Sequence, residues 1–69
     1  MIKMDILDYG IYCEGKHIAD ADDIDLAKHI AKDLAVSEEV NVIVICNFTG
    51  EIVAEFEVRY SVEIVEIEP

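Results

Sequence analysis

The first third of the chain alternates between apolar and polar residues, as β-strands do. A first alternating run comprises Ile2, Met4 and Ile6, and a second comprises Tyr9, Ile11 and Cys13. The phase changes between the two runs, so we expect a break or a bulge at residues 7–8. Glu14-Gly15 then separates two strand-like segments. Because glycine tolerates a positive φ, this dipeptide favours a tight hairpin turn.

The next segment has the period of an α-helix. Apolar residues recur at three- and four-residue spacing, at Ile24, Ala27, Ile30, Ala31, Leu34 and Ala35. This stripe is preceded by three acidic residues, Asp20, Asp22 and Asp23. An aspartate there can cap the first turn, and its charge suits the positive end of the helix dipole. We therefore predict a helix over residues 23–36.

The last third of the chain is predicted to form strands. Residues 40–46 are rich in β-branched side chains, residues 47–50 are typical of a turn, and residues 51–68 alternate. A two-residue loop at 48–49 would set Val42 opposite Glu55. A three-residue loop at 48–50 instead pairs Asn47 with Glu51, Cys46 with Ile52, Val44 with Ala54, Val42 with Phe56 and Val40 with Val58. We expect the three-residue loop, which matches apolar residues with one another.

This register predicts two different faces for the sheet. Beneath the helix we expect the set Val40, Val42, Val44, Cys46, Ile52, Ala54, Phe56 and Val58. The reverse face would carry an apolar centre made of Ile43, Ile45 and Val53. Four carboxylates at odd-numbered positions would point to the same face and border that centre: Glu51, Glu55, Glu57 and Glu63. Two of them that are two residues apart on a strand would be about 6.8 Å apart. A single strand over residues 51–68 would far exceed the mean of about 5–6 residues, so we expect an irregularity near residues 60–61.

These elements together predict one α+β domain over residues 1–69. Its order would be hairpin, helix and then two or three strands, in a single antiparallel sheet of four or five strands with the helix on one face. Because one helix can cover only one face of a sheet, the other face would be left to a partner.

Composition narrows the class of protein. The 69-residue chain has 16 Asp and Glu against 5 Lys and Arg, a formal net charge of −11 at pH 7, and 54% hydrophobic residues. The apolar content excludes an acidic disordered chain. The charge argues against direct binding to nucleic acid or to an anionic membrane surface, because both need basic patches.

We expect a cytoplasmic protein with reduced thiols. The longest apolar run, Val42 to Cys46, is far shorter than the about 20 residues of a membrane span. The first residues have neither the apolar core nor the cleavage site of a signal peptide. Two cysteines, Cys13 and Cys46, are too few for a disulfide framework.

Residues suited to catalysis or metal binding are sparse. Cys13, His17, His29 and Cys46 could bind zinc, but they lack closely spaced ligand pairs. The aspartates of residues 20–25 resemble the start of a calcium loop but lack its glycine and its terminal glutamate. Neither a serine-nucleophile motif nor a glycine-rich phosphate loop occurs. We therefore expect no cofactor, no metal and no enzymatic activity.

The acidic residues carry the strongest functional signal. One interpretation is solubility and protection of the sheet edges. The other is a docking surface for a basic protein or ribonucleoprotein, formed by Glu51, Glu55, Glu57, Glu63, Asp20, Asp22 and Asp23 around Ile43, Ile45 and Val53. A third hypothesis is a structural one, in which the uncovered face joins two copies in a homodimer.

Very small, strongly acidic chains of mixed α/β build resemble the anti-CRISPR and anti-restriction inhibitors of phages and mobile elements. The resemblance rests on size, charge and the acidic stretches at residues 20–25 and 51–57. It implies an inhibitor that acts as a nucleic-acid mimic or a steric blocker, and it assigns no residue a role. The Tyr9–Gly15 hairpin before a helix is also similar to HicB-type antitoxins, although their Pro-rich segment and separate DNA-binding module are missing.

Overall fold

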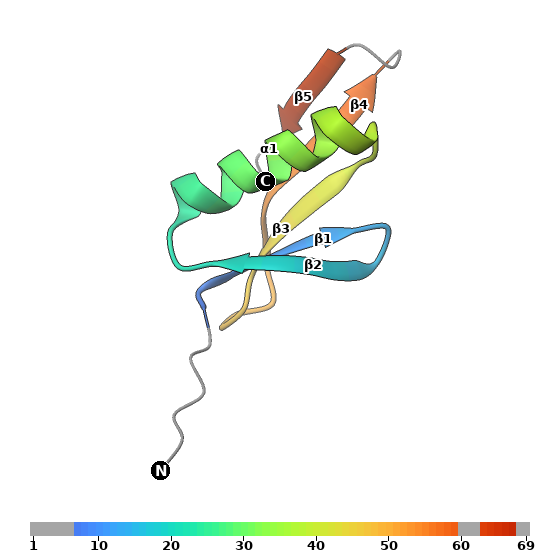
Figure 1. Ribbon diagram of the computed structural model, residues 1–69. Helices are drawn as coiled ribbons and strands as arrows, with labels where there is room; N and C mark the ends of the chain where they lie inside the picture. The colour runs from blue at the N-terminus through green and yellow to red at the C-terminus, as the bar shows by residue number, and fades with distance from the viewer. Residues whose placement is uncertain (1–6, 60–62, 68–69) are drawn as a thin grey trace.

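Five strands and one helix are formed by the residues that the computed structural model describes, 7–59 and 63–67. They are β1 (Tyr9–Cys13), β2 (Lys16–Ala21), α1 (Ile24–Glu38), β3 (Val42–Cys46), β4 (Ile52–Arg59) and β5 (Glu63–Ile67) (Figure 1). All neighbouring strands are antiparallel, and their order across the sheet is β2-β1-β3-β4-β5. The predicted α+β class, with one antiparallel sheet and one helix, is confirmed.

The hairpin of β1 and β2 turns at the predicted dipeptide. Glu14 and Gly15 both have positive φ values, 51° and 80°, as a two-residue turn between antiparallel strands requires. The register shifts by one residue within this hairpin, so Ile18 is an extra residue of β2. The expected strand over residues 2–6 lies outside the described residues, and β1 begins just after the predicted break at residues 7–8.

The helix begins where the sequence predicts and ends two residues later. The Asp23 carboxylate accepts a hydrogen bond from the Leu26 N–H at 3.1 Å, which caps the first turn. The predicted end at residue 36 is wrong, because α1 continues to Glu38 and stops at Glu39, whose φ is 53°. Residues 36–38 are exposed. Because this last turn does not pack on the sheet, it needs no buried apolar residue that would mark it as helical in the sequence.

The β3–β4 hairpin confirms two predicted pairs and corrects the rest. Val42 lies opposite Phe56 and Val44 opposite Ala54, as expected. Nearer the turn Ile45 lies opposite Ile52, so Val53 is an extra residue that forms a β-bulge. The Gly50 N–H donates to the Cys46 carbonyl at 2.7 Å, and the Cys46 N–H donates to the Glu51 carbonyl at 2.8 Å.

These hydrogen bonds enclose a loop of four residues, 47–50, so the predicted three-residue loop is wrong. The predicted pairs of Asn47 with Glu51 and of Cys46 with Ile52 do not form, because the bulge absorbs the one-residue slip without disturbing the core pairs. The predicted pair of Val40 with Val58 does not form either, because the pairing of β3 with β4 ends at Val42 and Phe56. The Val58 N–H donates instead to the Asn41 side-chain oxygen at 3.0 Å.

The third strand of the C-terminal half is β5, which pairs with β4. Arg59 lies opposite Glu63, and the register runs on to Glu55 opposite Ile67. The predicted irregularity near residues 60–61 falls outside the described residues. Because the sheet is strongly twisted, β2 and β5 at its two edges run in different directions (Figure 1).

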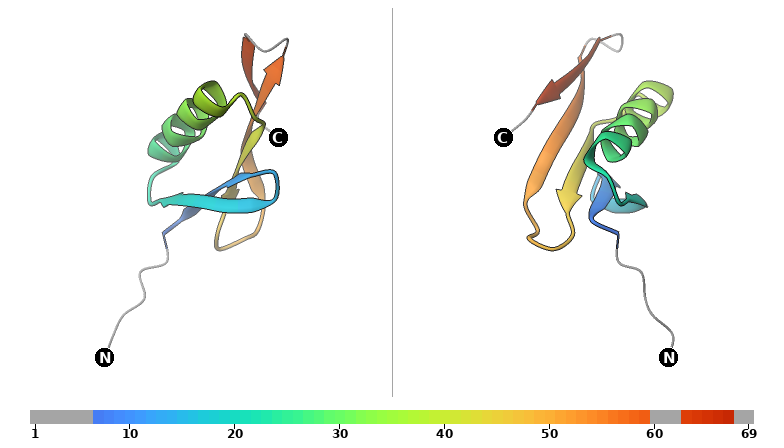
Figure 2. Two further views of the ribbon diagram at one scale, coloured as in Figure 1. Left: turned by 45° about the vertical axis from the view of Figure 1, so that its right-hand side comes forward. Right: turned by 90° about the vertical axis from the view of Figure 1, so that its left-hand side faces the viewer.

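The core lies between α1 and one face of the sheet (Figure 2). The helix contributes the small side chains Ala27, Ala31 and Ala35, all fully buried. The sheet contributes the larger buried residues Ile11, Val42, Val44 and Phe56, together with Ala54. Small residues on the helix allow its backbone to approach the strands, and the bulk of the core comes from the sheet.

Ala31 is therefore a position where added volume should destabilise the fold. In the Ala31→Leu variant the larger side chain has no space between α1 and the sheet, and we expect a loss of about 1–3 kcal/mol in the free energy of unfolding. Urea unfolding of the variant and the wild type measures this loss. Val36→Leu, at a helix position that is 55% exposed, is the matched control and should change stability by less than about 0.5 kcal/mol. Equal stability of the Ala31→Leu variant would contradict this packing.

Candidate functional site

The face of the sheet opposite α1, here called the open face, is not covered by any other element in the described part of the chain (Figure 2). One row of cross-strand neighbours on it runs from His17 through Tyr12, Ile43 and Glu55 to Ile67. A second row runs from Asp20 through Gly10 and Ile45 to Ile52. The open face therefore has an apolar centre on β1 and β3, with polar groups on both sides.

The predicted apolar centre is confirmed for two of its three residues. Ile43 and Ile45 are half-buried on β3 and have the parity opposite to the buried Val42 and Val44. Val53 instead lies in the bulge of β4 and packs against the core. Its place on the open face is taken by Ile52, which is 43% exposed and lies opposite Ile45.

The predicted row of carboxylates is divided by the same bulge. Glu55, Glu57 and Glu63 keep one parity through the pairing of β4 with β5. Glu51 precedes the bulge and lies level with Cys46, so it belongs to the parity of the other face. A cation also joins the row, because Arg59 lies opposite Glu63 and its Nη2 is 3.6 Å from a Glu57 carboxylate oxygen.

A cluster of polar side chains at the β2 side of the open face joins β2 to the β3–β4 loop and to the segment before β1. His17 Nε2–H donates to Asp20 Oδ1 at 2.9 Å, and the Asn47 amide donates to the same oxygen at 3.3 Å. The Asn47 amide also donates to the Leu7 carbonyl at 2.8 Å. The hydrogen bond from His17, helped by that from Asn47, holds the pKa of Asp20 below its usual value.

Gly10 provides the space for this cluster. A Cβ at this position would lie 2.8 Å from Tyr12 Cε1 and 2.9 Å from Asn47 Oδ1. The Tyr12 ring thus lies over the glycine, and its centroid is 5.2 Å from that of the His17 ring. The sequence pattern placed Asn47 in a turn and His17 among weak zinc-ligand candidates, but it did not predict that these two residues meet Tyr12 and Asp20. The signal that was available is a glycine within a strand, which often marks a close approach of another group.

The three aspartates before the helix have different environments. Asp20 belongs to the open face, opposite Gly10. Asp23 caps α1, and Asp22 is exposed between β2 and the helix. They are close in sequence, but the strand ends at Ala21, so only Asp20 joins the row that contains Ile45.

The two cysteines are free thiols and half-buried. The Thr49 side chain and the backbone N–H groups of Phe48 and Thr49 stabilise the Cys46 thiolate, which lowers the pKa of Cys46. Within residues 7–59 and 63–67, no three His, Cys, Asp or Glu side chains are grouped so that they could hold a metal ion. In the same ranges, no helix has both the length and the apolar character needed to cross a membrane.

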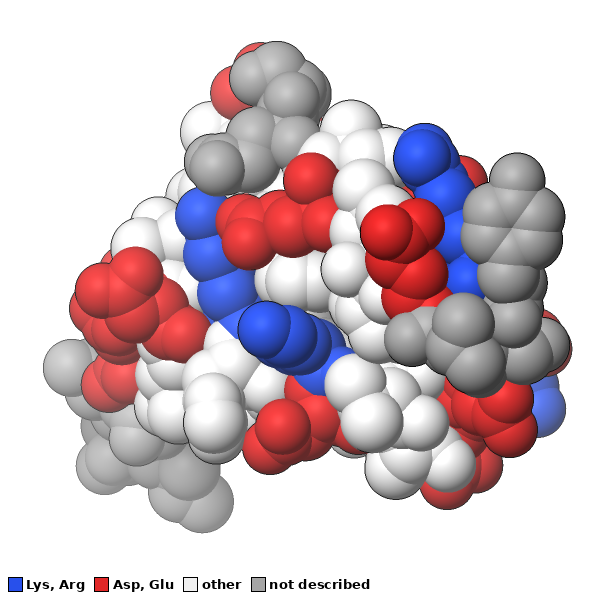
Figure 3. Space-filling model, turned by 90° about the horizontal axis from the view of Figure 1, so that it is seen from above, with Lys and Arg blue, Asp and Glu red and all other residues white. Residues whose placement is uncertain are grey.

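Positive charges are unevenly distributed over the surface. Seen from above, Lys and Arg side chains lie next to carboxylates (Figure 3). One of these contacts joins the helix to the edge strand, where Lys28 Nζ is 3.0 Å from a Glu66 carboxylate oxygen. In contrast, the segments 7–9, 20–25 and 46–52 contain no Lys or Arg. Within the described residues, these three segments therefore contribute carboxylates and no Lys or Arg, and a basic partner that the structure shows for them is His17, beside Asp20.

Comparison with known proteins found no matching family model, no matching curated protein and no matching solved structure.

The Asp20 cluster predicts a defined dependence of stability on pH. Because its pKa is lower in the folded chain than in the unfolded chain, Asp20 stabilises the fold above pH ~4, and this contribution is lost as the pH falls through the folded pKa. We expect Asp20→Asn to be less stable than the wild type at pH 7, with a difference that shrinks below pH ~4. Urea unfolding at several pH values measures both proteins. A difference that did not depend on pH would contradict the stabilised carboxylate.

Proposed function

We propose that this chain is a protein-binding inhibitor that occupies a basic, nucleic-acid-binding surface of a bacterial defence complex. The observation that supports this most directly is the composition of the open face. An apolar centre at Tyr12, Ile43 and Ile45 lies between Asp20 on β2 and Glu55 on β4. A buried apolar centre with a polar rim is the usual arrangement of a protein interface.

Electrostatics favours a partner that binds nucleic acid. Duplex DNA carries one negative charge per about 1.7 Å of its axis, and carboxylates two residues apart on a strand are about 6.8 Å apart. Glu55 and Glu57 therefore reproduce only part of the charge density of DNA, and the apolar centre supplies further binding energy. A lysine- and arginine-lined channel would attract this face at long range, so association should be fast and sensitive to salt.

Displacement of DNA from candidate targets tests this function. A fluorescent duplex bound to purified CRISPR effectors and restriction enzymes should be released when the chain is added, and less so at higher salt. The triple variant Glu55→Gln, Glu57→Gln, Glu63→Gln should bind about tenfold more weakly, because three rim charges at about 0.5 kcal/mol each contribute about 1.5 kcal/mol together.

The control is a triple variant on the helix, Asp25→Asn, Asp33→Asn, Glu38→Gln. It removes the same charge from exposed positions of α1 and should change binding by no more than about threefold. Equal weakening by the two triple variants would show that only net charge matters. Failure to release DNA from any target would reject the inhibitor proposal.

The apolar centre also favours a second candidate function, a homodimer through the open face. Ile52 lies opposite Ile45 of this centre, and Ile43 lies on the same face of β3. A face-to-face contact of two sheets would bury all three isoleucines. Sedimentation equilibrium should then show a dimer at micromolar concentration, and Ile45→Glu should convert it to a monomer by placing a charge in the contact. A monomeric wild type would reject this candidate.

A further inference from the structure

Phe48 is the most exposed of the large hydrophobic residues in the described part of the chain, with 67% of its surface accessible. It lies in the four-residue loop between β3 and β4. The conformation of this loop requires a residue with positive φ at Gly50, whose φ is 78°. The loop geometry gives no comparable reason for a phenylalanine at position 48.

Two hydrogen bonds hold the loop that presents Phe48: one closes the loop and the other lies just after Phe48. The Gly50 N–H donates to the Cys46 carbonyl at 2.7 Å, and the Glu51 N–H donates to the Thr49 hydroxyl at 3.2 Å. A loop closed in this way loses little conformational entropy when its exposed side chain binds a partner.

The residue just before Phe48 attaches the loop to the rest of the sheet. The Asn47 backbone N–H donates to the Asp8 carbonyl at 2.8 Å. Its side-chain amide donates to the Leu7 carbonyl at 2.8 Å and to Asp20 at 3.3 Å. Position 48 is therefore fixed relative to both the entry of β1 and the end of β2.

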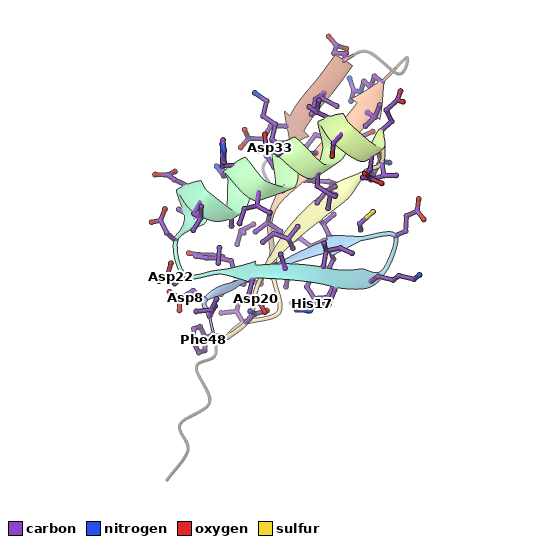
Figure 4. All side chains as sticks on the ribbon, viewed as in Figure 1. Asp8, His17, Asp20, Asp22, Asp33 and Phe48 are labelled. Atoms are coloured by element: carbon purple, nitrogen blue, oxygen red, sulfur yellow. The ribbon has the colours of Figure 1, made fainter. Side chains whose placement is uncertain are left out.

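Acidic residues from three segments lie next to the loop that carries Phe48. Asp8 and Asp20 are joined to the loop through Asn47, and Glu51 follows the loop directly. All three residues are exposed. Figure 4 shows Phe48 at the same end as Asp8, Asp20 and Asp22. The segments that meet here contain no lysine or arginine.

We propose that Phe48 is an anchor that inserts into an apolar pocket of a partner protein, and that lysine and arginine side chains border this pocket. The proposal rests on the proposed function for its partner, a basic nucleic-acid-binding protein. Aromatic side chains that are held in place and buried on binding contribute most of the energy of many interfaces. The carboxylates at this end require a positively charged rim, because an uncharged or acidic rim would leave these groups desolvated without compensation.

Such a pocket has the chemistry of a base-binding site. Proteins that bind single-stranded nucleic acid stack each base on an aromatic ring or a guanidinium group, and they bind the neighbouring phosphates with lysine and arginine. An exposed aromatic ring at the same end of the molecule as several carboxylates presents the same two features. Phe48 would then take the place of a base, and Asp8, Asp20 and Glu51 would take the place of phosphates.

A random peptide library displayed on phage tests the anchor without knowledge of the target. Selection against the full-length chain should yield peptides that combine aromatic residues with Lys or Arg. Synthetic copies should bind the Phe48→Ala variant at least about tenfold more weakly than the wild type in fluorescence anisotropy. Phe48→Tyr should retain binding within about threefold and Phe48→Leu should lose most of it, because stacking needs a ring.

Val36→Ala is the matched control, since Val36 is also an exposed apolar residue, 55% accessible, on the outer side of α1. It should leave peptide binding unchanged. The urea midpoint of Phe48→Ala should equal that of the wild type, which shows that the loss is one of contact and not of folding. A library that yields no binder dependent on Phe48, or peptides that bind Phe48→Ala as tightly as the wild type, would overturn the anchor.

The two proposals fail in different assays. Peptide binding that depends on Phe48, without release of DNA from any target, keeps the anchor and rejects the inhibitor. Release of DNA that is unaffected by Phe48→Ala keeps the inhibitor and rejects the anchor.

Discussion

The packing of α1 against one face of the sheet is the contact on which the rest of the structure depends. Ala27, Ala31 and Ala35 bring the helix close to the strands, and Val44 and Phe56 fill the space beneath it. A chain of 69 residues can bury only about 60% of its unfolded surface. The one helix covers one face of the sheet, and no other element of the described residues covers the opposite face.

The sheet is completed by contacts that join segments distant in sequence. Asn47 binds Leu7, Asp8 and Asp20, and so links the β3–β4 loop to both strands of the first hairpin. Gly10 makes this possible, because a side chain there would occupy the space of Asn47 and Tyr12. The same set of contacts positions Asp20 on the open face and fixes the loop that carries Phe48, so stability and the proposed binding surface depend on one polar cluster.

Charge has a cost and a use in this molecule. A net charge of −11 destabilises a compact state by self-repulsion. Part of it is offset locally, by Lys28 beside Glu66 and by Arg59 beside Glu57. The carboxylates near the β3–β4 loop have no Lys or Arg within the described segments 7–9, 20–25 and 46–52, and Asp20 is bound by His17 instead.

The sequence by itself determined the class of the fold, the helix with a cap from one of three aspartates, the Glu14-Gly15 turn and two core pairs of β3 with β4. These depend on local period, capping and turn chemistry, which nearest neighbours along the chain encode. Tertiary structure decided the order of the strands, with β1 between β2 and β3, because pairing partners far apart in sequence leave no local signal. It also decided the bulge at Val53, since parity arguments assume an unbroken ladder. That one residue moved Glu51 and Val53 off the open face and brought Ile52 onto it.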